Sequence, residues 1–375
     1  MTDFATIAIA GAGAMGSGIA QVCAQSGRDV LLFDLSQGAR ERGRDAIAQN
    51  LDRQISKGRI SRATADGVLS RIRLVATPEE LAPADLVIEA IIEKAEPKQA
   101  LFTTLERVCG PETVFATNTS SLGVAEIAAA LAAPGRLAGL HFFNPAQVMK
   151  LVEVVSHAAS PEGLTDRLAA FGRDIGKTPV ICADSPGFIV NRCARPYYGE
   201  ALAIFEEGDH DAPAIDAAMR QRGYRMGPFE LMDLVGADIN LAATEGVWNG
   251  LGRHPRYLPF AALRGQVERG ELGRKTGRGF VTPPVEAEPA PEAVADRIEA
   301  ALVNEACFAR DEGLADEAGI DTAMKLGLNF PRGPFEILAA MGREAVLARL
   351  AEASASAPED LRPRYVPAAS LEETR

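Results

Sequence analysis

The chain has 375 residues, of which 47% are hydrophobic and 24% charged, a balance typical of folded globular proteins rather than of disordered ones. Its formal net charge of −12, without any tail rich in lysine and arginine, disfavours nucleic acid as a partner. No apolar run approaches the roughly 20 residues that cross a bilayer, no signal sequence opens the chain, and the five scattered cysteines predict neither disulfides nor a metal site, so we expect a cytoplasmic protein without a membrane or metal partner.

The first predicted unit is a strand, a glycine-rich turn, a helix and a second strand. The strand at 6–10 leads into GAGAMGSG, a small-residue helix over 19–25 and a strand at 29–34. The glycines would permit a tight turn and close approach of a pyrophosphate, and the helix N-terminus would bind it through amide groups. Asp34 ends the second strand, where a carboxylate binds the ribose hydroxyls of NAD and repels the 2′-phosphate of NADP. We therefore predict an NAD site at Gly11, Gly13, Met15, Gly16 and Asp34.

Beyond this unit, helical and strand patterns alternate. Residues 37–71 have helical composition and hold eight basic residues against four acidic ones, a local charge of +4. Helical stretches at 98–108 and 124–131 then separate four predicted strands, at 85–91, 113–117, 137–143 and 151–155. The alternation predicts a mostly parallel, doubly wound sheet, that is, an α/β Rossmann-like domain over residues 1–185.

From residue 186 onward, helical spacing replaces the strand patterns and predicts an all-α region. The proline-rich residues 282–292 favour an extended linker. On its two sides, short sequences recur at an offset of about 105 residues, as Gly227-Pro-Phe-Glu230 does in Gly333-Pro-Phe-Glu336. Two copies are too few for a solenoid. We therefore predict two tandem copies of one helical domain, at 186–281 and 293–375.

One of the four histidines has a setting that suggests chemistry. His141 lies in a predicted strand, and the next predicted strand carries a lone carboxylate, Glu153, which needs a partner if it is buried. A hairpin centred on Gln147 would place Glu153 directly across from His141, within hydrogen-bonding reach. A carboxylate bound to one ring nitrogen fixes the tautomer and leaves the other nitrogen to act as a general base. A buried structural pair is the alternative interpretation.

Seven segments, taken in order, resemble the 3-hydroxyacyl-CoA dehydrogenase family over nearly the whole chain. They are GAGAMGSGIA, EAIIEK at 89–94, TNTSSL at 117–122, LHFFNP at 140–145, KLVEVV at 150–155, DSPGFIVNR at 184–192 and GRKTGRGF at 273–280. The resemblance implies a reversible, NAD-dependent oxidation of (S)-3-hydroxyacyl-CoA to 3-ketoacyl-CoA, with short chains such as 3-hydroxybutyryl-CoA, in fatty-acid metabolism and β-oxidation. The acyl chain itself stays open.

The resemblance also implies roles for particular residues. His141 would be the catalytic base and Glu153 its orienting partner. Ser120 and Asn191 would be polar groups around the reacting oxygen. Further cofactor contacts are implied at Glu93, Lys98 and Asn144. Contacts with coenzyme A are implied at Asn50 and Lys57, within the basic segment 37–71, whose charge would suit the phosphates of CoA.

Three alternatives remain open. The chain could be a hydroxyacid or sugar-acid dehydrogenase similar to gulonate dehydrogenase, or a non-catalytic NAD-binding protein similar to a lens crystallin. Shorter members of the resembled family dimerise through their helical domain, so the predicted second copy implies a monomer with an internal pseudo-dimer, with a homodimer as the alternative.

Overall fold

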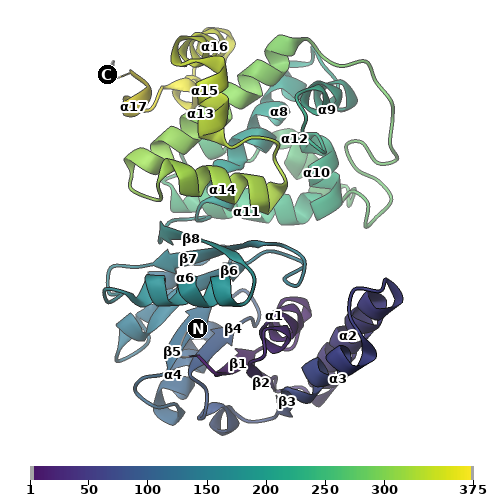
Figure 1. Ribbon diagram of the computed structural model, residues 1–375. Coiled ribbons are helices and arrows are strands. Elements are labelled where there is room, and N and C mark those ends of the chain that lie inside the picture. Colours follow the sequence, from purple (N-terminus) through teal and green to yellow (C-terminus); the bar gives the residue numbers. More distant parts are fainter. Residues whose placement is uncertain (1–3, 373–375) are drawn as a thin grey trace. The chain divides into compact units, whose positions relative to one another are not determined.

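The computed structural model describes residues 4–372, which fall into two compact units divided between Asp184 and Ser185. The first unit contains an eight-stranded sheet with helices on both faces, and the second is built from helices (Figure 1). A Rossmann-like sheet followed by a helical region is the predicted fold, and that prediction is confirmed. None of the described helices is both long and apolar enough to span a membrane.

The sheet of the first unit has the strand order β3-β2-β1-β4-β5-β6-β7-β8. Its described neighbours pair in parallel except β6 and β7, which are antiparallel. The strands are β1 (Thr6–Ala10), β2 (Asp29–Phe33), β3 (Ile72–Val75), β4 (Leu86–Glu89), β5 (Val114–Thr117), β6 (Leu137–Phe142), β7 (Leu151–Ser156) and β8 (Thr178–Ala183). All strands predicted from the sequence are present within a few residues of their expected bounds.

The first-unit helices are α1 (Ala14–Gln25), α2 (Gln37–Ser56), α3 (Arg62–Ser70), α4 (Ala95–Val108), α5 (Val124–Ala128) and α6 (Leu164–Asp174), with short 3₁₀ turns η1 (Pro78–Leu81) and η2 (Pro134–Arg136). Alternation along β5 shows how the two faces are covered. Ala116 belongs to the core shared with α1, α2, α3 and α6. Phe115, one residue earlier, points the other way, and its ring lies 5.8 Å from that of Phe102 in α4. The sheet is thus buried on both sides.

Two strands were not predicted. β3 is a four-residue edge strand whose Arg73 is exposed, so its apolar pattern is too short to stand out after the helical segment before it. β8 contains Pro179, which has no amide hydrogen for a central ladder, yet the strand lies at the other edge of the sheet, where proline is tolerated.

The second unit consists of helices α7 (Val190–Cys193), α8 (Arg195–Glu207), α9 (Ala212–Gln221), α10 (Pro228–Val235), α11 (Ala237–Gly250), α12 (Ala261–Glu268), α13 (Glu292–Asp311), α14 (Glu317–Leu328), α15 (Pro334–Met341), α16 (Arg343–Ser356) and α17 (Ala369–Glu372), with 3₁₀ turns η3 (Pro255–Tyr257) and η4 (Arg362–Tyr365). The long helix α13 is buried over most of its surface and packs against α8, α15 and α16. Between 185 and 372 the described chain contains no β-strand.

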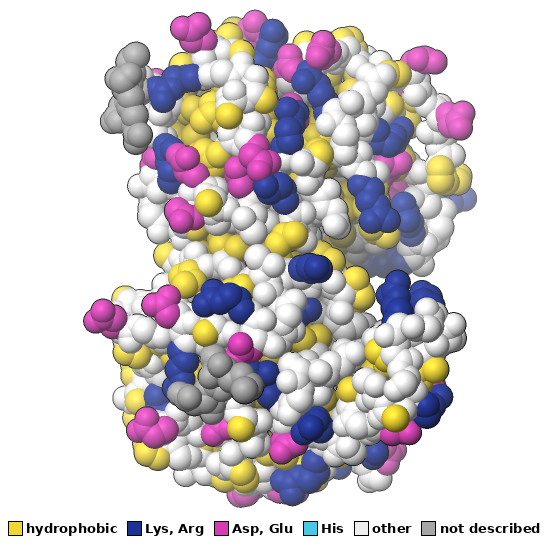
Figure 2. Space-filling view, in the orientation of Figure 1, with side chains coloured by type: hydrophobic (Ala, Val, Ile, Leu, Met, Phe, Trp, Pro, Cys, Tyr) yellow, Lys and Arg dark blue, Asp and Glu magenta, His cyan; other side chains and the backbone are white. Residues whose placement is uncertain are grey.

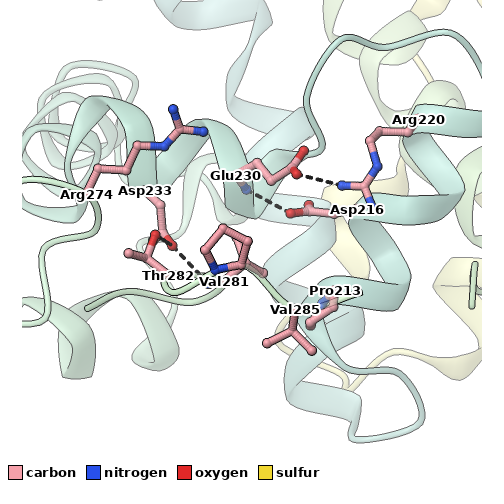
Figure 3. Close-up of a pocket in the computed structure, with 10 residues that line it drawn as sticks. Pro213, Asp216, Arg220, Glu230, Asp233, Arg274, Val281, Thr282 and Val285 are labelled. Carbon is pink, nitrogen blue, oxygen red and sulfur yellow. Dashed lines mark hydrogen bonds and ion pairs between the residues drawn. The ribbon is translucent and has the colours of Figure 1, made fainter. Parts of the chain in front are cut away.

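Two aspartates hold equivalent turns in this unit. Asp216 of α9 accepts hydrogen bonds from the amides of Phe229 and Glu230 at the start of α10, at 2.9 and 2.8 Å. Asp321 of α14 accepts bonds from the two corresponding amides at the start of α15. Burial raises the pKa of Asp216 to about 8. Figure 3 shows this carboxylate beside Glu230 at the start of α10, with Asp233 bonded to the chain at Val281 and Thr282.

Two buried glutamates also have matching partners. Glu305 of α13 accepts hydrogen bonds from a guanidinium near the start of the unit, at 2.8 Å, and from an arginine and a tyrosine of η3: Arg192, Arg256 and Tyr257. Glu200 of α8 accepts bonds from a guanidinium in the second turn of α13, at 2.6 Å, and from an arginine and a tyrosine of η4: Arg297, Arg364 and Tyr365. The contacts are reciprocal. Donors between residues 192 and 257 bind Glu305, and donors between residues 297 and 365 bind Glu200.

The surface carries both signs of charge. On the face shown in Figure 2, lysine and arginine side chains are interspersed with aspartate and glutamate rather than gathered into one large patch.

Candidate active site

The glycine-rich turn after β1 has the close backbone contacts that require glycine. Gly11 has a φ of +110°, and a Cβ there would lie 2.5 Å from the carbonyl oxygen of Ala90. A Cβ on Gly16 would lie 1.8 Å from the carbonyl oxygen of Gly11, so α1 can begin this close to the turn only without a side chain. Gly13, which precedes α1, faces open space. Met15 is half-buried and packs against the core.

A cavity of about 710 Å³ opens beside this turn. Gly11, Gly13 and Asp34 line its polar side. Mostly apolar side chains line the rest, among them Leu35 and Ile92, which are 83% and 61% exposed. Asp34 accepts hydrogen bonds from the amides of Ala12 and Ser36, both at 3.0 Å. An amide-lined helix start, a carboxylate at the strand end and apolar walls suit the pyrophosphate, ribose and adenine of NAD in turn. Neither Leu35 nor Ile92 was predicted from the sequence as a wall of this site.

Arg40 of α2 lies against the same strand end, where its guanidinium donates to the backbone carbonyl of Asp34. We expect Asp34→Ser to weaken NADH binding by roughly 10- to 100-fold, because bonds to a charged acceptor contribute about 1.5–3 kcal/mol. It should also admit NADPH, since Arg40 can pair with a 2′-phosphate once the carboxylate is gone. Fluorescence titration with both cofactors measures this. Asp34→Ser combined with Arg40→Ala should lose the NADPH binding; if it does not, Arg40 has no part in the discrimination.

His141 and Glu153 meet across β6 and β7. The two residues are direct partners in the antiparallel register, so the predicted hairpin is confirmed. His141 Nδ1 lies 2.6 Å from Glu153 Oε2, and the two residues are 5% and 0% exposed. An ionised carboxylate only accepts hydrogen bonds, so in a neutral ring this contact favours the tautomer with its proton on Nδ1. The ring of Phe143 lies 4.6 Å from that of His141 and helps to fix its plane.

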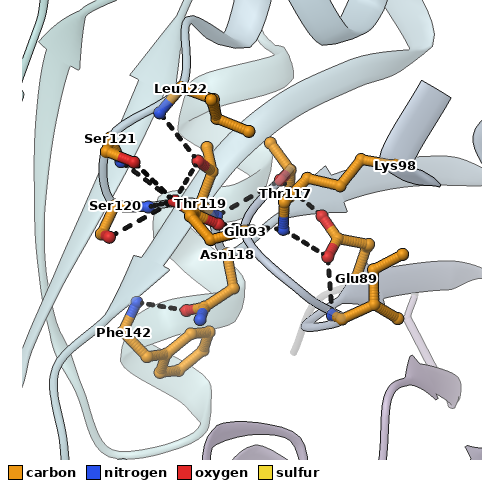
Figure 4. A network of polar contacts seen from close by, with 11 residues as sticks. Glu89, Glu93, Lys98, Thr117, Asn118, Thr119, Ser120, Ser121, Leu122 and Phe142 are labelled. Carbon is orange, nitrogen blue, oxygen red and sulfur yellow. Dashed lines mark hydrogen bonds and ion pairs between the residues drawn. The ribbon is translucent and has the colours of Figure 1, made fainter. Parts of the chain in front are cut away.

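A buried ion pair connects the ends of β4 and β5 with α4 (Figure 4). Glu89 Oε1 lies 2.6 Å from Lys98 Nζ and accepts a bond from the amide of Ile91, while Glu89 Oε2 accepts one from the hydroxyl of Thr117. Glu89 is 0% and Lys98 1% exposed. Sequence analysis missed Glu89, although a carboxylate at the end of an apolar strand was a signal for a buried partner.

Glu93 links this pair to the loop that follows β5. Its Oε2 lies 3.2 Å from Lys98 Nζ. Its Oε1 accepts hydrogen bonds from the hydroxyl of Thr119 and the amide of Ser120, both at 2.7 Å, and from the amide of Ser121 at 3.1 Å. Burial opposes ionisation, but Lys98 and these donors outweigh it and hold the pKa of Glu93 below its usual value. Three of the predicted site residues, Glu93, Lys98 and Ser120, are thus in one network.

The remaining predicted residues lie elsewhere. Asn144 is exposed and precedes a cis peptide bond to Pro145. Asn50 lies on α2, where its Oδ1 accepts bonds from Gln21 and Gln54, both at 2.9 Å. Lys57 caps the C-terminal end of α2 and is exposed. Seven residues apart, Asn50 and Lys57 share one side of the helix.

Asn191 belongs to the second unit. It lies in α7, and its carbonyl oxygen accepts a bond from Arg195 Nε at 2.8 Å. No group of three or more His, Cys, Asp or Glu residues within 4–372 is arranged to hold a metal ion.

Comparison with known proteins places the chain in a family. Residues 6–185 match the model of the NAD-binding domain of 3-hydroxyacyl-CoA dehydrogenase, and residues 187–283 and 294–374 match the model of its C-terminal domain. The chain is 46% identical to 3-hydroxyadipyl-CoA dehydrogenase of Escherichia coli K12, over 74% of the chain and 59% of that protein's length. It is 39% identical to human mitochondrial hydroxyacyl-coenzyme A dehydrogenase, over 73% of the chain and 90% of that protein.

Among solved structures, 3-hydroxybutyryl-CoA dehydrogenase of Escherichia coli K12 aligns over 98% of both chains, with a TM-score of 0.93 and 34% sequence identity. The E. coli 3-hydroxyadipyl-CoA dehydrogenase is longer than the matched region, whereas the human relative is covered almost entirely. The two family models together span nearly all of the described residues. The chain therefore belongs to the 3-hydroxyacyl-CoA dehydrogenase family, and its first unit is the NAD-binding domain of that family.

Proposed function

We propose that the protein oxidises (S)-3-hydroxyacyl-CoA to 3-ketoacyl-CoA with NAD, and catalyses the reverse reaction with NADH. The observation that carries the proposal is the contact of 2.6 Å between His141 and Glu153, in the unit that also holds the NAD cavity. An oriented imidazole suits a reaction in which a hydroxyl proton must leave as the carbon is oxidised. The names of the relatives supply the substrate class.

In the direction of oxidation, His141 Nε2 removes the proton of the 3-hydroxyl group. Bound NAD supplies the acceptor for the hydrogen that leaves C3 with its electron pair. Glu153 keeps its bond to Nδ1 and stabilises the imidazolium as it forms. The Ser120 hydroxyl donates a hydrogen bond to the substrate oxygen as its charge changes, and the family resemblance implies a further polar group at Asn191.

The test is consumption of NADH, followed by its absorbance, with acetoacetyl-CoA as the oxidant. The proposal expects rapid, saturable turnover. Turnover with a free sugar acid or hydroxyacid and NAD, but not with the CoA ester, would instead support the gulonate dehydrogenase alternative. NADH binding without turnover of either would support a non-catalytic protein. A panel of linear and dicarboxylic CoA esters then identifies the preferred acyl chain. One relative is named after 3-hydroxyadipyl-CoA and another after 3-hydroxybutyryl-CoA.

We further propose that Lys57 and Asn50 contact coenzyme A. Replacing Lys57 by alanine should raise the KM for acetoacetyl-CoA up to about fivefold, as expected for an exposed ion pair of up to about 1 kcal/mol. The KM for a truncated thioester without the nucleotide should not change. Arg44→Ala is the control: it removes the same charge from the same helix, on the opposite side by helical spacing. Equal effects of the two variants would point to the general charge of α2 instead of a contact at Lys57.

The second unit is proposed to consist of two tandem copies that pack as an internal pseudo-dimer. Supporting this are the repeated anchors at Asp216 and Asp321, the reciprocal contacts of Glu200 and Glu305, and the two separate stretches that match one domain model. Contacts exchanged in both directions are typical of an isologous interface. We accordingly expect the whole chain to be a monomer when its mass is measured by light scattering, and a stable dimer at low concentration would contradict this arrangement.

A further inference from the structure

The buried ion pair Glu89–Lys98 joins the end of β4 to the first turn of α4, which is an unusual position for two buried charges. Lys98 lies in the first turn of α4, where the helix dipole disfavours a cation. Its ammonium is almost without solvent contact and is held between two carboxylates, at 2.6 Å from Glu89 and 3.2 Å from Glu93. A buried ion pair contributes little net stability compared with apolar residues of the same size. Stability therefore does not explain why two buried charges are placed here.

What the pair does is orient Glu93. One carboxylate oxygen of Glu93 faces Lys98, and the other faces the loop after β5, as Figure 4 shows. That second oxygen accepts bonds from Thr119, Ser120 and Ser121, and so fixes three consecutive residues from a single atom. Lys98 is itself held from behind by Glu89, which is tied to β5 through Thr117. The chain of contacts runs from the sheet, through Lys98 and Glu93, to Ser120.

We propose that Glu89, Lys98 and Glu93 form a positioning relay that fixes the loop at 119–121 and thereby the Ser120 hydroxyl. The inference rests on the proposed function, in which Ser120 donates to the reacting oxygen. In this relay Lys98, which is 1% exposed, acts on the loop through Glu93. Displacing a positioned group by about 1 Å can cost on the order of 100-fold in rate.

Two variants separate positioning from stability. Lys98→Met leaves Glu89 buried without its cation, so it should lower both the melting temperature and kcat. Combining Lys98→Met with Glu89→Gln removes both buried charges. This double variant should recover most of the melting temperature, because an uncharged pair needs no compensation. Its kcat should remain low, since Glu93 still lacks the cation that orients it.

The readouts are kcat and KM with acetoacetyl-CoA and NADH, together with hydrogen exchange of the amides at 119–121. We expect both variants to lose roughly 10- to 100-fold in kcat, with the KM for NADH little changed, and to exchange these amides faster. Arg28→Met is the matched control, because it removes a buried guanidinium paired with Asp174 in the same unit but far along the chain from the loop. It should lower the melting temperature without speeding exchange at 119–121.

The outcomes are distinguishable. A raised KM for NADH with kcat retained would make Lys98 a cofactor contact and overturn the relay. Normal kcat in the double variant, or unchanged exchange at 119–121, would also overturn it. If the parent protein does not reduce acetoacetyl-CoA but the variants still show faster exchange at 119–121, the proposed function fails while the positioning of the loop stands.

Discussion

Replacing His141 by glutamine is expected to lower turnover of acetoacetyl-CoA by roughly 100- to 10,000-fold, the contribution usual for general acid–base catalysis. NADH binding should persist, because the cavity beside the glycine-rich turn does not include His141. The measurement is kcat from NADH absorbance, together with an NADH titration of the same preparation. Turnover near that of the parent protein would remove His141 from the mechanism.

Glu153→Gln tests the other residue of the His141–Glu153 pair. A glutamine amide can donate to Nδ1 and so favour the tautomer with its proton on Nε2, which could no longer accept from the substrate. We expect a loss comparable to that of His141→Gln. His157→Gln is the control, because His157 lies just beyond β7 and bonds the backbone carbonyl of Leu137 through Nε2 at 2.8 Å. It should keep a rate close to that of the parent protein.

The second large effect is expected in stability. Replacing Glu305 by glutamine leaves the buried Arg192 paired only with the half-exposed Glu312, and removing the buried partner of a buried ion pair costs about 3–5 kcal/mol. The melting transition of the helical unit should fall by roughly 6–20 °C, taking about 2–4 °C for each kcal/mol in a unit of this size. Glu200→Gln should have an effect of similar size, because its contacts are the reciprocal ones. Calorimetry measures both, and a marked difference between them would contradict equivalent roles.

The stability that the Glu200 carboxylate contributes depends on pH. Burial acts to raise the pKa of Glu200, but Arg364 and Arg297 outweigh it and lower that pKa below its ordinary value. The ionised carboxylate therefore contributes its full stability above the ordinary pKa of glutamate, about 4.3, and loses it as the pH falls through the lower folded value. The difference in stability between parent and variant should thus narrow only in strongly acidic solution. If the difference in stability between parent and variant disappeared already near neutral pH, that result would contradict this expectation.

Sequence reasoning succeeded where one local pattern decides the structure. The spacing of His141 and Glu153 around Gln147 was enough to give the register of β6 and β7, because a hairpin with alternating faces leaves few choices. The glycine-rich turn and Asp34 were recognisable for a similar reason: a strand, a turn and a helix follow one another directly.

What the sequence did not reveal depends on contacts between distant segments. Lys98 could be read as a cofactor contact but not as the partner of Glu89, since nothing local to α4 says which strand ends beside it. Arg40 looked like one charge among many in a basic helix, yet it lies against the carbonyl of Asp34. Side chains such as Leu35 and Ile92 become walls of a cavity only once β2 and β4 lie on either side of β1.

The reciprocal contacts of the helical unit have a consequence for how the chain can vary. When two identical subunits meet, every substitution appears on both sides of the interface at once. In a single chain the two halves are separate stretches of sequence, so each can change alone. The position 105 residues after Asn191 is Asp296, which is ion-paired with Arg222 and lies 3.8 Å from Arg349. Under the proposed duplication, the location that carries the Asn191 amide in one copy carries an ion-paired carboxylate in the other, whereas two identical subunits would carry the same residue at both places.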